Sequence, residues 1–208
     1  MKVVLLHAWP LDEGMWETQL GPLHAAGFET EAPRLYGRGP SIDAWASQLL
    51  DELEGQLVAV GASMGGYTAL ALARRAPERV VGTVLLGSPA TADTTERRAE
   101  RDELIVQLRS NGVPADLDTD VEAEDLAVAQ EAIRDRPDST SVVAAFGGPL
   151  LVCVGDRDDV LSVADARAIA DRALLGTLHV FPGAGHLVSV EQPSAFGDVV
   201  LEFLAQWT

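Results

Sequence analysis

The sequence predicts an α/β fold, in which a mostly parallel sheet of about six strands has helices on both faces. Two observations predict this class. Short apolar runs alternate along the chain with longer segments of helical periodicity. Several of these runs, such as VVLL at residues 3–6, are apolar at every position, which is typical of strands buried on both faces. Strands that alternate with helices need crossover connections, and these make neighbouring strands parallel.

The individual elements follow from apolar spacing and from turn residues. Strands are expected at 3–6, 28–32, 56–61, 80–87, 149–155 and 177–181. Helices are expected at 15–26, 42–53, 64–76 and 163–175, with a closing helix that begins at Pro193. Ser41 is placed to cap the second helix at its N-terminus, and Gly27 to end the first at its C-terminus.

Residues 90–147 interrupt the alternation, because they contain no convincing strand. Two charge-rich amphipathic helices are predicted instead, at 94–112 and 122–136. A chain of 208 residues is long enough for one domain with a full core and short for two. We therefore expect a single domain over 1–208, with a short helical lid insertion at 90–147.

Composition and charge exclude several classes of function. Fifteen basic residues stand against 32 acidic ones, and the net charge of −17 repels the phosphate backbone of nucleic acids. The single cysteine, Cys153, excludes a disulfide-stapled scaffold. No apolar stretch approaches the roughly 20 residues that span a bilayer, and the N-terminus lacks a secretory signal pattern. We expect a cytoplasmic protein with neither a nucleic-acid nor a membrane partner.

The segment GASMG contains Gly61, Ser63 and Gly65 where a predicted strand turns at once into a helix. So sharp a turn strains its central residue, and a side chain two positions away on either side would collide with the turn. The strain lifts the Ser63 hydroxyl clear of the sheet. It also leaves the Met64 N–H at a helix N-terminus, where it can stabilise negative charge. Ser63 is therefore the candidate nucleophile, and it needs a base.

His186 is the best candidate for that base among the four histidines. It lies in a glycine-rich loop just after the last predicted strand, and parallel sheets place their chemistry in loops at the carboxyl ends of strands. His24 is expected in solvent on a helix, and His179 within a strand. We expect His7, at the end of the first strand, to orient the following loop by hydrogen bonds and not to act as the base.

A histidine base needs a carboxylate that fixes its tautomer and stabilises its charged form. Three aspartates, Asp156, Asp158 and Asp159, directly follow the predicted strand 149–155. The order serine, aspartate, histidine along the chain is one of the known orders for such a triad. Periodicity alone does not choose among the three aspartates.

Four segments, in this order, resemble motifs of the serine α/β-hydrolase family. HAWPLDEGMW resembles its histidine-led oxyanion loop, GASMGG its nucleophile elbow, GDRDDV its acid turn, and GAGHLVSVEQPSAF its histidine loop and final helix. The resemblance runs from residue 3 to the C-terminus, and its first segment is similar to the esterase and enol-lactone hydrolase branch. It implies the α/β-hydrolase fold with a catalytic triad of Ser63, Asp158 and His186.

The resemblance also implies an oxyanion hole made by the backbone N–H groups of Trp9 and Met64. Pro10 favours an extended conformation at Trp9, which would help to hold that amide in place. The side chains of Trp9, Met64 and Leu187 are the candidates for substrate contact.

Other aromatic and basic residues are expected to have structural or surface roles. Trp16 and Trp45 fit ordinary core packing better than the pocket. Arg34, Arg38 and Arg157 have the chemistry to hold a substrate carboxylate, but arginines are more often solvated.

Three features depart from the family pattern. Ala8 stands where many members have glycine, and Arg34 replaces an aspartate in APRLYGRGPS. The two leading antiparallel strands common in the family are expected to be missing. The insertion at 90–147 is short for a full cap, so we expect either an open pocket or a site completed by a second copy in a homodimer.

The sequence therefore predicts a cofactor-free hydrolase of a small ester, thioester or lactone that works through an acyl-enzyme. The same triad would also serve carbon–carbon bond hydrolysis or perhydrolysis. A small-molecule binding protein that keeps the fold without turnover is the rival from another class. No metal site is expected, because the histidines and carboxylates lack ligand spacing.

Overall fold

The computed structural model describes residues 1–207, and its centre is one six-stranded sheet in which every neighbouring pair is parallel. The strands are β1 (Lys2–Leu6), β2 (Glu29–Glu31), β3 (Leu57–Ala62), β4 (Val80–Leu86), β5 (Pro149–Gly155) and β6 (Leu175–Phe181). Their order across the sheet is β2-β1-β3-β4-β5-β6. The predicted fold class is therefore confirmed.

Helices occupy the connections between these strands. They are α1 (Glu17–Ala25), α2 (Ile42–Glu52), α3 (Met64–Arg75), α4 (Thr95–Asn111), α5 (Ala123–Arg134), α6 (Thr140–Ala145), α7 (Val163–Arg172), α8 (Val188–Glu191) and α9 (Pro193–Leu204). Two short 3₁₀ turns, η1 (Glu13–Trp16) and η2 (Ala205–Trp207), precede α1 and follow α9. Within residues 1–207, no helix has both the length and the apolar character to cross a membrane.

Most element boundaries agree with the predictions. The segment expected as one helix at 15–26 is a 3₁₀ turn followed by α1. The helix expected to reach residue 175 ends at Arg172, because β6 already begins at Leu175. A Cβ on Gly176 would lie 1.9 Å from the carbonyl oxygen of Ala170, so glycine lets the strand start directly against the helix.

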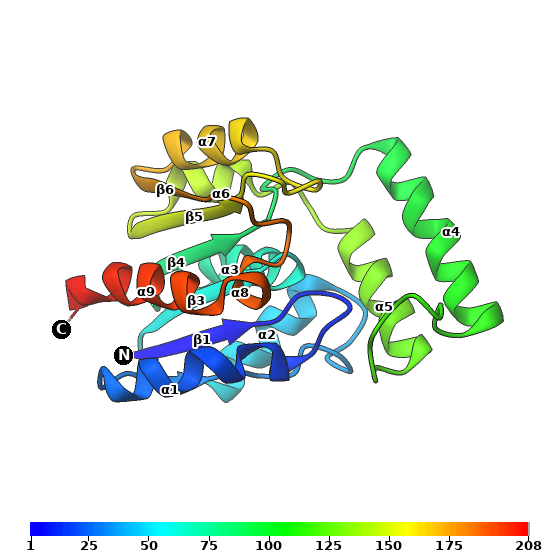
Figure 1. The fold of residues 1–208 in the computed structure, drawn as a ribbon, viewed down its shortest axis with the longest axis horizontal. Helices are drawn as coiled ribbons and strands as arrows, with labels where there is room; N and C mark the ends of the chain where they lie inside the picture. The colour runs from blue at the N-terminus through cyan, green and yellow to red at the C-terminus, as the bar shows by residue number, and fades with distance from the viewer. Residues whose placement is uncertain (208) are drawn as a thin grey trace.

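Helices cover both faces of the sheet (Figure 1). α1 and α9 pack on one face, and α2, α3 and α7 pack on the other. Because neighbouring residues of a strand point to opposite faces, β1 sends Leu5 to the first core and Leu6 to the second. Trp16 lies in the first core and Trp45 in the second, with exposures of 0% and 1%, so the prediction of core packing is confirmed.

The insertion forms a helical lid at the carboxyl ends of the strands (Figure 1). α4 and α5 pack against each other there, and α6 leads back to β5. Ile105 and Leu108 of α4 are buried together with Leu126 of α5. Arg109 forms an ion pair with Glu124 at 2.8 Å, but both side chains are exposed, and such pairs contribute little. Apolar packing therefore contributes more to the lid than this exposed pair.

His7 ends β1 and is fully buried. Its Nε2 accepts a hydrogen bond from the Leu35 N–H at 2.9 Å, so this nitrogen carries no proton. The proton is assigned to Nδ1, which lies 3.1 Å from the Ala8 carbonyl oxygen and donates to it. Burial lowers the pKa of His7 to about 4, which keeps the ring neutral near neutral pH. The predicted hydrogen bonds of His7 are present, and its role in orienting the loop stays a prediction.

Phe196 joins α9 to the sheet, and its removal tests that packing. Its buried ring lies 6.0 Å from the Trp16 ring and 6.2 Å from the Phe181 ring. We expect Phe196→Ala to lower the free energy of unfolding by about 3–5 kcal/mol, because it leaves a cavity. Phe203→Ala on the same helix, where the ring is only partly buried, is the matched control. Urea unfolding measures both, and equal losses would contradict this assignment.

The neutral His7 ring predicts a loss of stability in acid. As the pH falls from about 6.5 to about 4, His7 becomes protonated in the unfolded chain but stays neutral in the folded chain. The free energy of unfolding should therefore fall by about 3 kcal/mol across this window through His7. His7→Gln keeps an acceptor for the Leu35 N–H and does not titrate, so its stability should fall less with acid.

Denaturant unfolding of wild type and His7→Gln at about pH 7 and about pH 4.5 measures this difference. His24→Gln, which changes an exposed histidine, serves as the control. Parallel curves for wild type and His7→Gln would show that His7 titrates alike in both states.

Candidate active site

Ser63 stands at a strained turn between β3 and α3. Its φ is 49° and its ψ is −110°, and it is the one non-glycine residue with positive φ in residues 1–207. Such a conformation costs on the order of 1–3 kcal/mol, and the surroundings must enforce it. Here the Ser63 N–H donates to the Leu86 carbonyl at 2.8 Å, and the Ser63 carbonyl accepts from the Gly66 N–H at 2.9 Å.

Two glycines make room for this turn. A Cβ on Gly61 would lie 2.3 Å from the carbonyl oxygen of Gly65. A Cβ on Gly65 would lie 2.0 Å from the carbonyl oxygen of Leu6 in β1. The prediction that a side chain would collide with the turn is therefore confirmed at Gly61, whereas at Gly65 the collision would be with β1.

Ser63, His186 and Asp158 form one hydrogen-bonded chain. His186 Nε2 lies 3.0 Å from Ser63 Oγ, and His186 Nδ1 lies 3.0 and 3.1 Å from the two Asp158 carboxylate oxygens. The Asp158 side chain is fully buried, whereas the His186 side chain keeps 20% exposure. The backbone N–H groups of Val160 and Leu161 also donate to Asp158 Oδ1, at 2.8 and 3.1 Å.

These contacts fix the charge of Asp158 and the tautomer of His186. Burial raises the pKa of the Asp158 carboxyl. The hydrogen bond to His186 and those from the Leu161 and Val160 N–H groups lower the pKa by more than burial raises it. The net pKa lies below the ordinary value, so the carboxylate is charged near neutral pH. The carboxylate accepts a hydrogen bond from Nδ1–H of His186, so the lone pair on Nε2 faces the Ser63 hydroxyl.

The other sequence candidates for base and acid lie away from this chain of contacts. Asp156 and Asp159 are exposed, and Asp156 accepts a hydrogen bond from the Gly183 N–H at 2.7 Å. His24 and His179 are exposed as well. Of the three aspartates that follow β5, the structure brings Asp158 to His186.

Gly87, which the sequence analysis did not single out, makes room for the His186–Asp158 pair. Its φ is 58°, and a Cβ there would lie 2.9 Å from two ring atoms of His186 and 3.0 Å from Asp158 Oδ2. The available signal was a glycine at the end of an apolar strand, which often marks a close approach of another group.

The N–H groups of Trp9 and Met64 are unoccupied donors. Neither has a hydrogen-bond partner among residues 1–207. Met64 directly follows Ser63 at the start of α3, and Trp9 lines the same cleft as Ser63. Free backbone N–H groups beside a nucleophile are what an oxyanion hole requires. The Trp9–Pro10 peptide bond is cis.

Side chains from elsewhere hold the loop of residues 7–12. The Ala8 N–H donates to Met15 Sδ at 3.1 Å, the Pro10 carbonyl accepts from the Thr119 hydroxyl at 2.8 Å, and the Leu11 carbonyl accepts from the Tyr36 hydroxyl at 2.8 Å. The loop is therefore held in position by contacts from η1, from Tyr36 and from the lid insertion.

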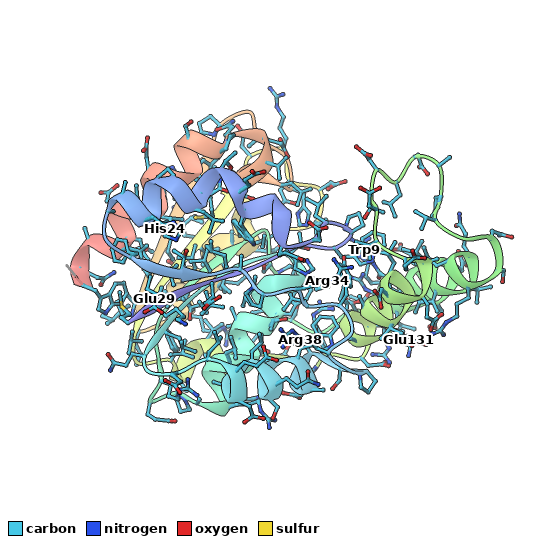
Figure 2. The ribbon with its side chains drawn as sticks, turned by 90° about the horizontal axis from the view of Figure 1, so that it is seen from below. Trp9, His24, Glu29, Arg34, Arg38 and Glu131 are labelled. Atoms are coloured by element: carbon cyan, nitrogen blue, oxygen red, sulfur yellow. The ribbon has the colours of Figure 1, made fainter. Side chains whose placement is uncertain are left out.

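Two further contacts connect this loop to the lid. The Trp9 indole N–H donates to the Leu126 carbonyl of α5 at 3.3 Å. Arg34, which replaces the aspartate of the family pattern, lies 3.6 Å from Glu13 and 3.9 Å from Asp125 of α5. Figure 2 shows Trp9 and Arg34 near the junction of the body and the lid, with His24 and Glu29 far from it.

A cleft of about 400 Å³ contains Ser63 and His186 in its wall. The body of the protein also contributes Trp9, Pro10, Tyr67, Val160 and Leu187, and the lid contributes Arg97, Glu100, Arg101, Leu104, Gln130 and Ile133. Trp9 and Leu187 are thus at the cleft. The Met64 side chain is not, because it is fully buried in the core and leaves its backbone N–H to the site.

The lid residues of this cleft were missed from the sequence. Arg97, Arg101 and Leu104 recur at helical spacing on α4, and this stripe was the available signal. The arginines singled out from the sequence do not line the cleft. Arg38, for example, pairs with Glu52 at 2.7 Å.

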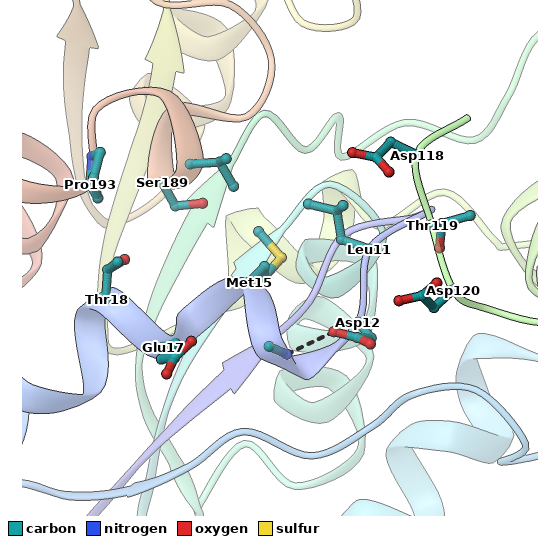
Figure 3. A pocket seen from close by; sticks show the side chains of 12 residues that line it. Leu11, Asp12, Met15, Glu17, Thr18, Asp118, Thr119, Asp120, Ser189 and Pro193 are labelled. Carbon is teal, nitrogen blue, oxygen red and sulfur yellow. Dashed lines mark hydrogen bonds between the residues drawn. The ribbon is translucent and has the colours of Figure 1, made fainter. Parts of the chain in front are cut away.

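A second hollow of about 430 Å³ lies at the other side of the same loop (Figure 3). Leu11, Asp12 and Met15 line it from the loop and η1, and residues 118–120 line it from the lid. None of the triad side chains lines this hollow. Within residues 1–207, no group of three or more histidine, cysteine, aspartate or glutamate side chains could hold a metal ion.

Comparisons with known proteins identify hydrolases that are similar to this chain in sequence. The pimeloyl-[acyl-carrier protein] methyl ester esterase of Aromatoleum aromaticum is 41% identical over 104 residues, which are 47% of this chain and 41% of that protein. The chain therefore aligns with less than half of that relative. The 2-hydroxymuconate semialdehyde hydrolase of Pseudomonas sp. (strain CF600) is 28% identical over 205 residues, which are 86% of this chain and 72% of that protein.

The fold is that of solved esterases. A thermophilic esterase from Thermogutta terrifontis superposes with a TM-score of 0.91 at 28% identity, over 99% of this chain and 90% of that one. A model of the alpha/beta hydrolase family matches residues 3–199. That match covers nearly the whole sequence, so this chain belongs to the α/β hydrolase family.

Proposed function

We propose that this protein is a serine hydrolase that cleaves a small carboxylic ester, thioester or lactone through an acyl-enzyme, without a cofactor. The single observation that carries the proposal is the geometry of His186. Its two ring nitrogens lie 3.0 Å from the Ser63 hydroxyl and 3.0 Å from a buried carboxylate. A serine hydroxyl is a weak nucleophile until such a base takes its proton.

The first half of the reaction forms the acyl-enzyme. Ser63 Oγ attacks the substrate carbonyl carbon, and His186 Nε2 takes the hydroxyl proton. Asp158 holds Nδ1–H, which keeps the lone pair of Nε2 on the serine and stabilises the imidazolium that forms. His186 then gives its proton to the leaving oxygen or sulfur, and the bond to the leaving group breaks.

The free N–H groups of Trp9 and Met64 are proposed to hold the oxyanion of the tetrahedral intermediates. Their charge stabilisation is large because the donors are fixed before the reaction begins. In the second half, a water takes the place of the leaving group. His186 removes a proton from that water, and the water oxygen attacks the acyl carbon. The bond to Ser63 Oγ then breaks, and Oγ takes the proton back from His186.

A second candidate function is carbon–carbon bond hydrolysis with the same triad. It is favoured by the 2-hydroxymuconate semialdehyde hydrolase relative, which matches across 86% of this chain. Ester cleavage is preferred because the identities to esterases are higher: 41% over 104 residues for the esterase relative, and 28% for the solved esterase against 20% for a solved meta-cleavage product hydrolase. A panel of chromogenic esters and lactones, run beside a vinylogous 1,5-diketone acid, separates the two by which substrate turns over.

The triad proposal predicts covalent labelling and its loss. We expect a fluorophosphonate probe to label wild type and not Ser63→Ala. Asp158→Asn should lower kcat by about 10³–10⁴-fold, because an amide favours the wrong His186 tautomer. Asp156→Asn, an exposed neighbour with the same change of charge, is the matched control and should stay within about twofold of wild type. A folded wild type that neither labels nor turns over any ester would favour the binding-protein alternative.

The oxyanion proposal predicts a positioning role for Met15. Met15→Leu keeps the side-chain volume but removes the sulfur that accepts the Ala8 N–H. We expect kcat to fall about tenfold with KM nearly unchanged, which is less than the hundredfold or more lost with a whole oxyanion donor. Affinity for an alkyl boronic acid, which mimics the tetrahedral state, should fall in parallel. An effect on KM alone would contradict the assignment.

A further inference from the structure

We infer that the lid side of the cleft binds a carboxylate of the substrate through the Gln130 amide and the Tyr67 hydroxyl. The substrates would then be esters or lactones that carry a second, free carboxylate on the part that faces the lid. This inference rests on the proposed function and narrows it to a substrate class.

Gln130 is a fixed donor in the wall of the cleft. The residue is only 2% exposed, and its Oε1 accepts a hydrogen bond from Arg101 at 2.7 Å. Because a guanidinium only donates, this contact identifies the oxygen and leaves Nε2 as the free end of the amide. Nε2 has no hydrogen-bond partner among residues 1–207.

The free end of Gln130 faces the cleft. Some buried side-chain N and O atoms of the described chain have neither a hydrogen-bond partner nor contact with water. They belong to Glu13, Trp16, Thr83 and Ser189. Gln130 Nε2 is not among them, so it keeps contact with water, and the hollow that Gln130 lines is the catalytic cleft. An oriented amide N–H with no protein acceptor is suited to bind an oxygen of a ligand.

Tyr67 offers a second donor close to the nucleophile. It follows Ser63 by one turn of α3, lines the same cleft and is only 6% exposed. Its hydroxyl has no hydrogen-bond partner within residues 1–207. Burial raises the pKa of Tyr67, so the hydroxyl keeps its proton and can donate it.

A largely buried excess of positive charge lies next to both donors. Arg101 and Arg136 both pair with Asp93, so two guanidinium groups face one carboxylate. The Asp93 and Arg136 side chains are each 5% exposed, and Arg101 is 15% exposed. Arg101 also holds Gln130, and the Arg136 guanidinium lies 4.0 Å from the centre of the Tyr67 ring.

The charges at the cleft surface do not cancel this excess. Arg97 and Glu100 line the cleft from α4, but they pair with each other at 2.9 Å. The other lid residues of the cleft, Leu104 and Ile133, are apolar. One net positive charge and two neutral donors fit a carboxylate, which brings two acceptor oxygens and a single negative charge.

The test compares methyl monoesters of dicarboxylic acids, from succinate to suberate, with the matched esters in which a primary amide replaces the free carboxylate. The readout is the ratio of kcat/KM for the acid to kcat/KM for its amide partner. In wild type we expect this ratio to reach about tenfold or more at the chain length that spans Ser63 and the subsite.

Gln130→Glu keeps a partner for Arg101 but turns the free donor into an anionic acceptor. We expect it to lower the ratio at least tenfold, and Tyr67→Phe to lower it severalfold. Gln107→Glu, which makes the same change at an exposed position of α4, should leave activity on both substrates unchanged. A wild-type ratio near one at every chain length would overturn the inference, and so would a ratio that neither variant changes.

Failure of the subsite and failure of the proposed function are distinguishable. Turnover of the amide partner with a ratio near one rejects the subsite and leaves the hydrolase intact. If no ester turns over, calorimetry on Ser63→Ala measures binding of monomethyl adipate against its amide partner. Tighter binding of the acid, lost on Gln130→Glu, supports the subsite, and equal binding of the two rejects it.

Discussion

The whole site depends on the close approach of α3 to β1. Gly65 sits so near the Leu6 carbonyl that no Cβ fits between them, and this close approach lies two residues after the strained turn at Ser63. Because β1 pairs with β3, with Leu6 opposite Gly61, the loop after β1 begins beside that turn. The ends of the next strands continue the pattern, with Gly87 after β4, Asp158 after β5 and His186 after β6. Parallel pairing thus delivers every group of the site to one edge.

The loop that supplies Trp9 is held from outside. Its contacts come from Met15 in η1, from Tyr36, and from Thr119 and Leu126 in the lid insertion. Because the lid makes two of these contacts, a shift of the lid would alter the position of the Trp9 amide. Under the proposed oxyanion role of the Trp9 N–H, access to the cleft and stabilisation of the oxyanion are linked. Arg34 adds charge contacts on both sides of the same junction.

The framework of the fold and site followed from local patterns. Apolar runs identified the strands, and crowding explained Gly61 and Gly65 from the sequence alone. The choice of Asp158 among three adjacent aspartates needed the family resemblance, because a turn of three carboxylates has no period. The inner face of the lid was not predicted, because charged residues flank the apolar stripe of α4 and only the packing on α5 shows which of them face Ser63.

The net charge of the protein and the local charge at the cleft have opposite signs and act over different distances. The chain carries a net charge of −17, which disfavours the approach of any anion. Salt screens that repulsion beyond about 8 Å. The Arg101–Asp93–Arg136 cluster is largely buried at the cleft, which Arg101 lines, and screening is weak there. A carboxylate subsite in an acidic protein therefore acts through contact and not through long-range attraction. The subsite would therefore slow dissociation of the substrate from the cleft and would not speed its association.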